Sequence, residues 1–452
     1  MSQNSTLPSK FISRIATQLP DYDMLIAALD DVPTVAVRTN SLKTDLTGNI
    51  HKNVPWCSTG YYLHVRPIFT IDPLFHAGAY YVQEASSQFL DYILRNILPQ
   101  NPLKVLDLCA SPGGKSTLAV SILPQRSLLV ANDAIHTRIP ALCDNLSRWG
   151  YANYMVTCND ASDFAQLGEY FDVILVDAPC SGEGMFRKIV HSRSEWSVEH
   201  VQHCSMRQKR IVSDVLPCLK QGGYLIYSTC TFAPQENEDN VQHFTTELPL
   251  QNITSGIEVP DEWKITKSEF GFHFYPHRLQ GEGFFISILQ KCDEYHSLHK
   301  SSNKKRHYAE VYKDKGNIIK PYLKNYDDYS FFYMNEYIHT IDNSYTEDLQ
   351  YLLSRVNVRY AGVCVGKIAH NEPVPSHDLA LCLQINENLP CVETDIDNAI
   401  KFLKKGSINF DKQYPNGWYL VRYQGLNLGW IKVIGNRYNN YYPNELRILK
   451  DF

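Results

Sequence analysis

Two cysteines stand in short polar loops that could carry thiol chemistry. The sequence DAPCSGEG at positions 177–184 contains Cys180, and Cys230 ends the run Ser-Thr-Cys at positions 228–230. Each loop directly follows an apolar stretch typical of a buried strand, so both cysteines are expected at the same edge of one parallel sheet. A single cysteine in such a place is usually a small buried hydrophobe, but two beside hydroxyls, turn residues and an acid indicate reactive thiols.

Methylation of carbon 5 of a pyrimidine is a reaction that needs this arrangement. That carbon is a poor nucleophile until a thiolate adds to C6 and converts the ring into an enamine. Because a free cysteine with a pKa of about 8.5 is mostly protonated at neutral pH, the attacking thiol must be ionised or assisted. An acid such as Asp177 can supply a proton at N3 while negative charge builds on the ring. A base must then remove the C5 proton, and the thiol must leave; the residues alone do not decide which cysteine attacks.

A glycine turn between a strand and a helix precedes these loops. The run LKVLDL at 103–108 predicts a buried strand, Pro112 and Gly113 end it, and a helical pattern begins at Lys115. Glycine lets a ligand approach the backbone closely, and the helix start presents free N–H groups. A P-loop would need glycine where Cys109 stands, and a dinucleotide fingerprint would need more than one glycine pair. The segment therefore predicts a cradle for another nucleotide-like ligand.

Three strand candidates that follow the cradle each end in an aspartate. Asp133, Asp160 and Asp177 close apolar stretches, and helical patterns lie between them. This alternation predicts an α/β fold with a doubly wound parallel sheet, in which ligands bind at the carboxyl ends of the strands. The acids suit a ligand with ribose hydroxyls, an exocyclic amine and a positive centre. S-adenosylmethionine has all three; NAD would serve for the first two, so the chemistry of the site has to decide between them.

The composition is that of an ordinary globular chain. Its 452 residues predict two to four domains, and its net charge of -5 means that any RNA-binding surface must be local. Its twelve cysteines include no C-x-x-C pair, so we expect neither a metal site nor a disulfide framework. Because no apolar run reaches membrane length and the first ten residues are polar, we expect a cytoplasmic protein without a membrane partner.

At its motifs the chain resembles the Sun-type RNA (cytosine-5) methyltransferases. The resemblance runs through LDLCASPGGK at 106–115, DAPCSGEG at 177–184 and Ser-Thr-Cys at 228–230, and includes YVQEASS at 81–87 and PHRLQGEGFF at 276–285. It implies a Rossmann-like class I methyltransferase fold with a late antiparallel strand at 283–290. It also implies S-adenosylmethionine as the cofactor.

The resemblance assigns a role to each site residue. Cys230 would be the nucleophile and Cys180 would assist release of the product, while Asp177 and Lys115 would act beside the methyl donor and the cytosine N3. The segment 109–115 would bind the methionine part of the cofactor. The cofactor-binding residues implied in this way are Cys109, Ala110, Ser111, Pro112, Gly113, Gly114, Lys115, Asp133 (ribose), Asp160 (adenine) and Asp177. The chain departs mildly from the family pattern, with Ser111 where alanine is commoner and Asp133 where glutamate is common.

Four segments are expected along the chain. They are an N-terminal α+β RNA-binding domain (1–100), the methyltransferase domain (101–292), a basic linker with a first C-terminal domain (293–375) and a PUA-like RNA-binding domain (376–452). The last segment resembles the terminal domain of the bacterial small-subunit ribosomal RNA methyltransferase F family, through LGWIK at 428–432 and NYYP at 440–443. We therefore expect a monomeric enzyme whose partner is 16S ribosomal RNA, free or within the small subunit.

A basic, tyrosine-rich stretch at 300–326 is a second candidate for RNA contact. Lysines and tyrosines are interleaved in it, as in surfaces that hold phosphates and stack single-stranded bases, although a solvated linker would look similar. Its basic residues are Lys300, Lys304, Lys305, Arg306, Lys313, Lys315, Lys320 and Lys324, with His296, His299 and His307 nearby, and its tyrosines are Tyr308, Tyr312, Tyr322 and Tyr326.

The sequence leaves several alternatives. A tRNA cytosine-5 methyltransferase would share these motifs, and a catalytically silent rRNA-binding assembly factor would share the fold. An amino-group methyltransferase would carry an aromatic residue where Cys180 stands, and a dehydrogenase would need the missing glycine fingerprint. Because both cysteines and all three acids are present, we favour the RNA cytosine-5 methyltransferase.

Overall fold

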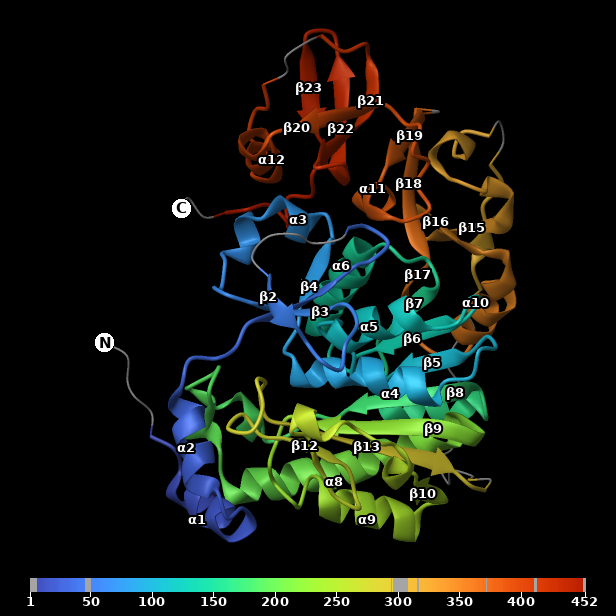
Figure 1. Ribbon diagram of the computed structural model, residues 1–452. Helices are drawn as coiled ribbons and strands as arrows, with labels where there is room; N and C mark the ends of the chain where they lie inside the picture. Colours follow the sequence, from blue (N-terminus) through green and yellow to red (C-terminus); the bar gives the residue numbers. More distant parts are fainter. Residues whose placement is uncertain are drawn as a thin grey trace.

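A ten-stranded sheet lies at the centre of the computed structural model, which describes residues 6–44, 50–293, 295, 308–314, 317–370, 372–409 and 413–449. Its middle consists of five parallel strands in the order β9-β8-β5-β6-β7 (Figure 1). Their bounds are β5 (Lys104–Asp107), β6 (Leu128–Asn132), β7 (Tyr154–Thr157), β8 (Phe171–Asp177) and β9 (Leu219–Thr229). The carboxyl ends of these strands meet at one edge, where the predicted site residues follow them.

Antiparallel strands extend the sheet on both sides. Next to β9 lies β13, which β12 and β11 follow, and the strand at the other edge is β17. The bounds are β10 (Leu250–Asn252, paired with β13), β11 (Thr266–Lys267), β12 (Phe272–Phe274), β13 (Phe284–Lys291) and β17 (Val358–Ala361). The predicted Rossmann-like sheet with a late antiparallel strand is thus confirmed.

Helices cover both faces of the sheet because its strands are apolar on both sides. Successive residues of β8 alternate between two cores: Val173 and Leu175 belong to one, Ile174 and Val176 to the other. The first core also receives α4 (Phe89–Ile97), α5 (Gly114–Ile122) and α6 (Ile139–Trp149). The second receives α8 (Val198–Val215), α9 (Glu238–Glu247) and α10 (Thr346–Leu353). Burial on both faces explains why these strands read as near-continuous apolar runs.

The N-terminal segment consists of two helices and a small sheet. The helices α1 (Ser9–Gln18) and α2 (Tyr22–Asp30) are separated at Pro20, as the sequence predicts, and the sheet has the order β2-β3-β1-β4. Its remaining elements are β1 (Ala36–Thr39), β2 (Ile50–Asn53), β3 (Gly60–Leu63), α3 (Pro73–His76) and β4 (Tyr80–Val82). Phe11 of α1 packs edge-on against Phe186 and Trp196 of the segment after β8, so the first helix reaches the neighbourhood of the cysteine loops.

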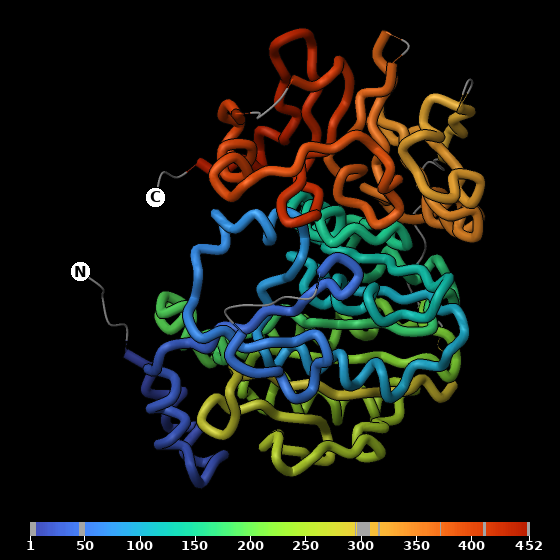
Figure 2. The backbone as a smooth tube through the Cα atoms, turned by 45° about the horizontal axis from the view of Figure 1, so that its top comes forward, coloured from blue at the N-terminus to red at the C-terminus, as the bar shows by residue number. Residues whose placement is uncertain are grey.

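Two small sheets form the C-terminal part, at the opposite end of the molecule from α1 and α2 (Figures 1 and 2). The first has the order β14-β15-β16-β18-β19 and the second the order β20-β21-β22-β23. Their elements are β14 (Glu310–Val311), β15 (Tyr329–Met334), β16 (Tyr337–Asp342), β18 (Val363–Ala369), β19 (Glu372–Pro375), α11 (His377–Leu381), β20 (Cys391–Thr394), α12 (Ile396–Leu403), β21 (Gly417–Tyr423), β22 (Leu426–Ile434) and β23 (Arg437–Asn440).

The segment 293–375 is less separate from the methyltransferase sheet than the sequence predicts. Its strand β17 pairs with β7, and Tyr360 stacks on Tyr154 with ring centroids 5.7 Å apart. Leu349 and Leu352 of α10 are buried in the second core. This arrangement covers the edge of β7, which would otherwise present unpaired backbone groups. In the part of the chain that the structure describes, no helix is long and apolar enough to cross a membrane.

Candidate active site

The two cysteine loops leave the sheet side by side. Parallel pairing of β8 with β9 places Asp177 opposite Ser228, and each loop begins at the end of its strand. The two sulfur atoms of Cys180 and Cys230 lie 3.0 Å apart, and the backbone N–H of Cys230 donates to Cys180 Sγ at 3.3 Å. Two cysteines that are fifty residues apart in the chain therefore form one contact, at the sheet edge that the sequence predicts.

Glycine allows the Cys180 loop to lie directly on the segment before β13. A side chain at Gly184 would place its Cβ 2.3 Å from the carbonyl oxygen of Gly283, which no real contact tolerates. Beside this approach, Arg187 forms a buried ion pair with Glu282 at 2.9 Å and donates to the Gly281 carbonyl. The two Gly-Glu-Gly sequences thus meet, and their contact fixes the far end of the loop.

A lysine–aspartate pair stands beside the cysteines. Lys115 Nζ lies 2.8 Å from Asp177 Oδ2, and the Ser228 hydroxyl donates to Asp177 Oδ1 at 2.8 Å. Burial acts to lower the pKa of Lys115, but the charges of Asp177 and Asp107 and the hydrogen bond to Asp177 outweigh it and raise this pKa above its ordinary value. Lys115 therefore carries a positive charge inside the site.

Cys180 is held in the thiol form. Its contact with Cys230 raises the pKa of the Cys180 thiol well above the ordinary value, and burial and the nearby Glu236 act in the same direction. A group with such a raised pKa is a proton donor at neutral pH rather than a nucleophile.

The predicted cradle lies between β5 and α5. The Ala110 N–H donates to the Asn132 carbonyl at 2.7 Å, and the Asn145 side-chain amide donates to the Pro112 carbonyl at 2.7 Å. Gly113 has φ of 111°, a left-handed conformation that favours glycine, and α5 begins at the next residue. The helix α5 therefore begins close to the carboxyl end of β5, and its first N–H groups have no carbonyl partner within the helix.

A cavity at this edge is lined by Cys109, Asp133 and Asp160, together with Pro179 of the Cys180 loop. Asp133 Oδ1 accepts the Ile135 N–H at 2.9 Å. Its other oxygen is buried and accepts no hydrogen bond from the described residues, although Arg138 Nη1 lies 3.1 Å away without hydrogen-bond alignment. A buried carboxylate oxygen with free acceptor capacity fits a ligand hydroxyl.

Three family models match the chain. The model described as 16S rRNA methyltransferase RsmB/F matches residues 95–290, the N-terminal domain of 16S rRNA methyltransferase RsmF matches 7–85, and the methyltransferase RsmF PUA domain matches 389–448. Curated proteins named ribosomal RNA small subunit methyltransferase F are similar over almost the whole chain. Those of Vibrio cholerae and Vibrio vulnificus are 28% and 29% identical, and each alignment covers 99% of this chain and 98% of the relative. The chain belongs to the Sun-type RNA methyltransferases.

A solved methyltransferase homologue from Pyrococcus horikoshii shares the central part of this Sun-type fold. It is 26% identical, with a TM-score of 0.54, over 63% of this chain and 95% of its own. The protein is therefore an S-adenosylmethionine-dependent RNA methyltransferase, as its motifs predict.

Several residues that organise the Sun-type site were missed by sequence reasoning. Asn132 ties three strand ends together: its side-chain amide donates to the carbonyls of Leu108 and Asn159 at 3.0 Å each, and its Oδ1 accepts the Asn159 N–H at 3.0 Å. Arg210 of α8 comes within 3.7 Å of Asp160 and lines the same cavity. The position of Asn132 at a predicted strand end was a usable signal, whereas no sequence pattern connects α8 with the acid at 160.

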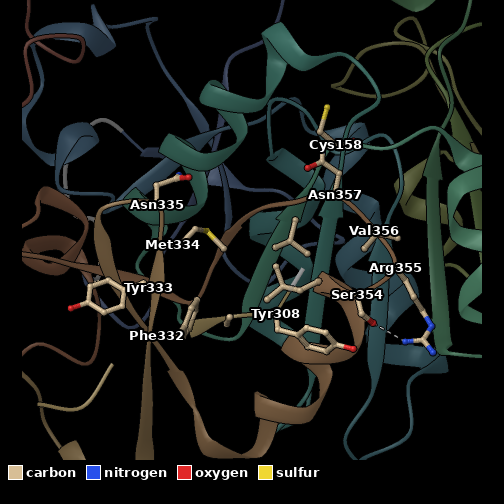
Figure 3. A pocket seen from close by; sticks show the side chains of 13 residues that line it. Cys158, Tyr308, Phe332, Tyr333, Met334, Asn335, Ser354, Arg355, Val356 and Asn357 are labelled. Carbon is tan, nitrogen blue, oxygen red and sulfur yellow. Dashed lines mark hydrogen bonds between the residues drawn. The ribbon is translucent and has the colours of Figure 1, made fainter. Parts of the chain in front are cut away.

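A second cavity, of about 620 Å³, lies beyond the end of β7 (Figure 3). The residues that line it include Tyr308, Phe332, Met334 and Arg355. They also include Cys158, the residue that directly follows β7. None of the predicted catalytic or cofactor-binding residues contributes to it, but Tyr308 belongs to the stretch predicted to contact RNA.

The basic stretch predicted to contact RNA is only partly described. Lys300, Lys304, Lys305, Arg306, Lys315, His296, His299 and His307 lie outside the described residues. Tyr326 stacks on Phe331 and donates to Asp314, and Tyr322 packs against Trp430, so these two rings serve the C-terminal core. Lys324 forms an ion pair with Glu387 at 2.5 Å, whereas Tyr308 is exposed.

Asp107, at the end of β5, is fully buried below the Lys115–Asp177 pair. The Ser116 hydroxyl donates to Asp107 Oδ2 at 2.6 Å, and Oδ1 accepts no hydrogen bond from the described residues. Burial raises the pKa of Asp107 to about 7; the Ser116 bond opposes this shift and the charge of Asp177 adds to it. Asp107 is therefore still partly protonated at neutral pH.

This raised pKa predicts a pH-dependent stability. Between the unfolded pKa near 4 and the folded pKa, the folded state binds the extra proton, so stability falls as the pH rises through this range. In Asp107→Asn this contribution is gone. Urea unfolding should show that wild type loses on the order of 1–3 kcal/mol relative to Asp107→Asn between pH 5 and pH 8. The exposed Asp397→Asn serves as the control and should follow wild type; equal pH dependence in all three proteins would contradict the assignment.

Proposed function

We propose that this enzyme transfers a methyl group from S-adenosylmethionine to carbon 5 of a cytosine in small-subunit ribosomal RNA, through a covalent bond between Cys230 and C6. The observation that carries the proposal is the pair of sulfur atoms 3.0 Å apart at the ends of adjacent strands, beside the Lys115–Asp177 ion pair. Methyl transfer to a nitrogen or oxygen atom requires no cysteine pair. A silent assembly factor would have no need to keep both.

Cys230 is assigned as the nucleophile and Cys180 as the residue that assists release. The Sun-type resemblance gives this division, and the electrostatics support it, because the raised pKa of Cys180 keeps that thiol protonated. Cys180 lies within 3.0 Å of the other sulfur and can therefore return a proton to it.

The reaction begins when the Cys230 sulfur adds to C6, and the C5–C6 π electrons move to C5. Asp177 would bind the N3 side of the ring while charge builds there, and the Lys115 ammonium, 2.8 Å from Asp177, supplies positive charge. When bound, S-adenosylmethionine would supply an electrophilic methyl group: as C5 forms its new bond to the methyl carbon, the bond between that carbon and the cofactor's sulfur would break, with its electron pair staying on the sulfur. Loss of the C5 proton to a base then restores the C5–C6 double bond as the S–C6 bond breaks. The electron pair of the S–C6 bond returns to Cys230, and Cys180 can protonate that sulfur.

The cradle and the strand-end acids are proposed to hold the cofactor. Cys109, Ala110, Ser111, Pro112, Gly113, Gly114 and Lys115 would bind the methionine part, with Asp133 on the ribose, Asp160 on the adenine and Asp177 near the methyl group. The unfilled acceptor on Asp133 and its place in the same cavity as Asp160 support this order.

Ribosomal RNA is the proposed substrate because relatives named for small-subunit rRNA match this chain from end to end, with a PUA domain model over 389–448. A tRNA substrate is the alternative. Bisulfite sequencing of rRNA and tRNA from a deletion strain, with and without the restored gene, separates them: the proposal requires a cytosine of 16S rRNA that loses its methyl group on deletion and regains it on complementation.

The assignment of Asp133 predicts a specific loss of cofactor affinity. Asp133→Ala should weaken S-adenosylmethionine binding by roughly 1–3 kcal/mol, because the ribose hydroxyls lose their buried acceptor. Titration calorimetry measures this directly, with Asp397→Ala on the surface of α12 as the matched control. Equal affinities of wild type and Asp133→Ala would remove Asp133 from the cofactor site.

The division between the cysteines predicts two different arrested states. Cys230→Ala should neither methylate RNA nor form a covalent complex, because no other sulfur is assigned to attack C6. Cys180→Ala should attack and methylate but release slowly, leaving a protein–RNA adduct on a denaturing gel. The double variant should form no adduct. An adduct in Cys230→Ala together with none in Cys180→Ala would show that the two roles are reversed.

A further inference from the structure

Two buried glutamates connect the cysteine loops, and each of them accepts a backbone N–H of the opposite loop. Glu183, on the Cys180 loop, accepts the backbone N–H of Phe232 from the Cys230 loop at 3.1 Å. Glu236, which follows Cys230 in the chain, accepts the backbone N–H of Ser181 from the Cys180 loop at 3.0 Å. Both side chains are fully buried. Each loop therefore holds its neighbour through a carboxylate.

The two glutamates differ in their surroundings. Glu183 pairs with Arg14 of α1 at 2.6 Å and accepts the Trp196 indole N–H at 2.7 Å, so its charge is neutralised. Glu236 receives hydrogen bonds from neutral donors: the Ser181 hydroxyl, and the Gln208 amide at 2.8 Å. Buried charge without a cation is costly, so its presence next to a catalytic loop needs an explanation beyond packing.

Hydrogen bonds fix the orientation of the Glu236 carboxylate. Gln208 donates to it and also to the Pro179 carbonyl at 3.0 Å, and the Gln208 oxygen accepts the Tyr227 hydroxyl at 3.0 Å and the Asn240 amide at 2.7 Å. A fully connected network of this kind leaves little freedom to its members. The residues on both sides of Cys180 in the chain are thus tied to Glu236, one directly and one through Gln208.

Glu236 also acts on Cys180 electrically. Its charge is among the causes that raise the pKa of the Cys180 thiol, and burial raises the pKa of Glu236 itself to about 7. A negative charge on Glu236 therefore makes it harder for the Cys180 thiol to lose its proton.

We propose that Glu236 is a positioning residue, which fixes Cys180 against Cys230 through Ser181 and keeps the Cys180 thiol protonated for product release. This inference rests on the proposed division between the cysteines. It adds to the release step a residue that acts on Cys180 through the neighbouring Ser181.

The test compares Glu236→Gln with Glu238→Gln, a matched change two residues away whose side chain faces His273 instead of the cysteine loops. In Glu236→Gln an amide N–H₂, which accepts no hydrogen bond, replaces one of the two carboxylate oxygens that accept from Ser181 and Gln208, and the negative charge is lost. Without RNA, alkylation of Cys180 by iodoacetamide, followed by peptide mass spectrometry, should be at least about tenfold faster, as a fall of one pKa unit gives tenfold more thiolate. With RNA, the covalent adduct should accumulate although cofactor affinity is unchanged, and Glu238→Gln should behave as wild type in both assays.

The two assays separate this inference from the proposed function. Unchanged Cys180 alkylation and unchanged adduct levels in a folded Glu236→Gln would overturn the role of Glu236 while RNA methylation continues. Faster Cys180 alkylation in Glu236→Gln, together with a wild-type enzyme that does not methylate RNA, would uphold the positioning role and reject the proposed reaction. If Glu236→Gln does not fold, Ser181→Ala removes one donor to the carboxylate and should raise the alkylation rate in the same direction; no change there would also overturn the inference.

Discussion

Parallel pairing of β8 with β9 places Asp177 opposite Ser228, and the two cysteine loops leave the sheet from these positions. This register decides which groups can meet. A shift by one residue would turn every side chain of the shifted strand to the other face of the sheet and would separate Asp177 from the Ser228 hydroxyl. The parallel strands are buried on both faces, and such burial specifies the register strongly. The chemistry of the site therefore depends on the apolar residues of strands that take no part in it.

Charge inside the site is arranged before any ligand arrives. Lys115 keeps its proton because Asp177 and Asp107 surround it, and Cys180 keeps its proton because of Cys230, burial and Glu236. In a buried environment such fixed charges act more strongly than they would in water, and they do not need to reorganise during the reaction. Asp107 shows the opposite effect of burial, because its carboxyl group lies so deep that its pKa is raised to about 7. One site thus combines the charged Lys115, the protonated thiol of Cys180 and the sulfur of Cys230 in contact with that thiol.

Much of this arrangement was predictable from the sequence. The strands β6, β7 and β8 and the two cysteine loops follow from apolar runs and turn residues, because parallel strands bring their carboxyl ends to one edge. Strand β8 ends at Asp177 as predicted, whereas β6 and β7 end at Asn132 and Thr157, just before Asp133 and Asp160. Arg210 and Glu236 were not predictable in this way, since they reach the site from helices and loops whose spatial neighbours no local pattern encodes. Strand β17 was missed for a related reason: its four residues pair with β7 across about 200 residues of chain, a contact set by the open sheet edge. The tyrosines at 322 and 326 looked suited to RNA but fill a core, because an aromatic ring serves either purpose.

A covalent bond between one named sulfur and the pyrimidine C6 is the central claim, and mass spectrometry of a trapped complex tests it most directly. RNA that contains 5-fluorocytosine cannot lose fluorine as a proton is lost, so wild-type enzyme should stop with the methylated nucleotide still attached. After protease and nuclease digestion, the account predicts that the nucleotide is found on the peptide that contains Cys230. A nucleotide on the Cys180 peptide, or methylated fluorocytosine RNA that never becomes attached to protein, would contradict it.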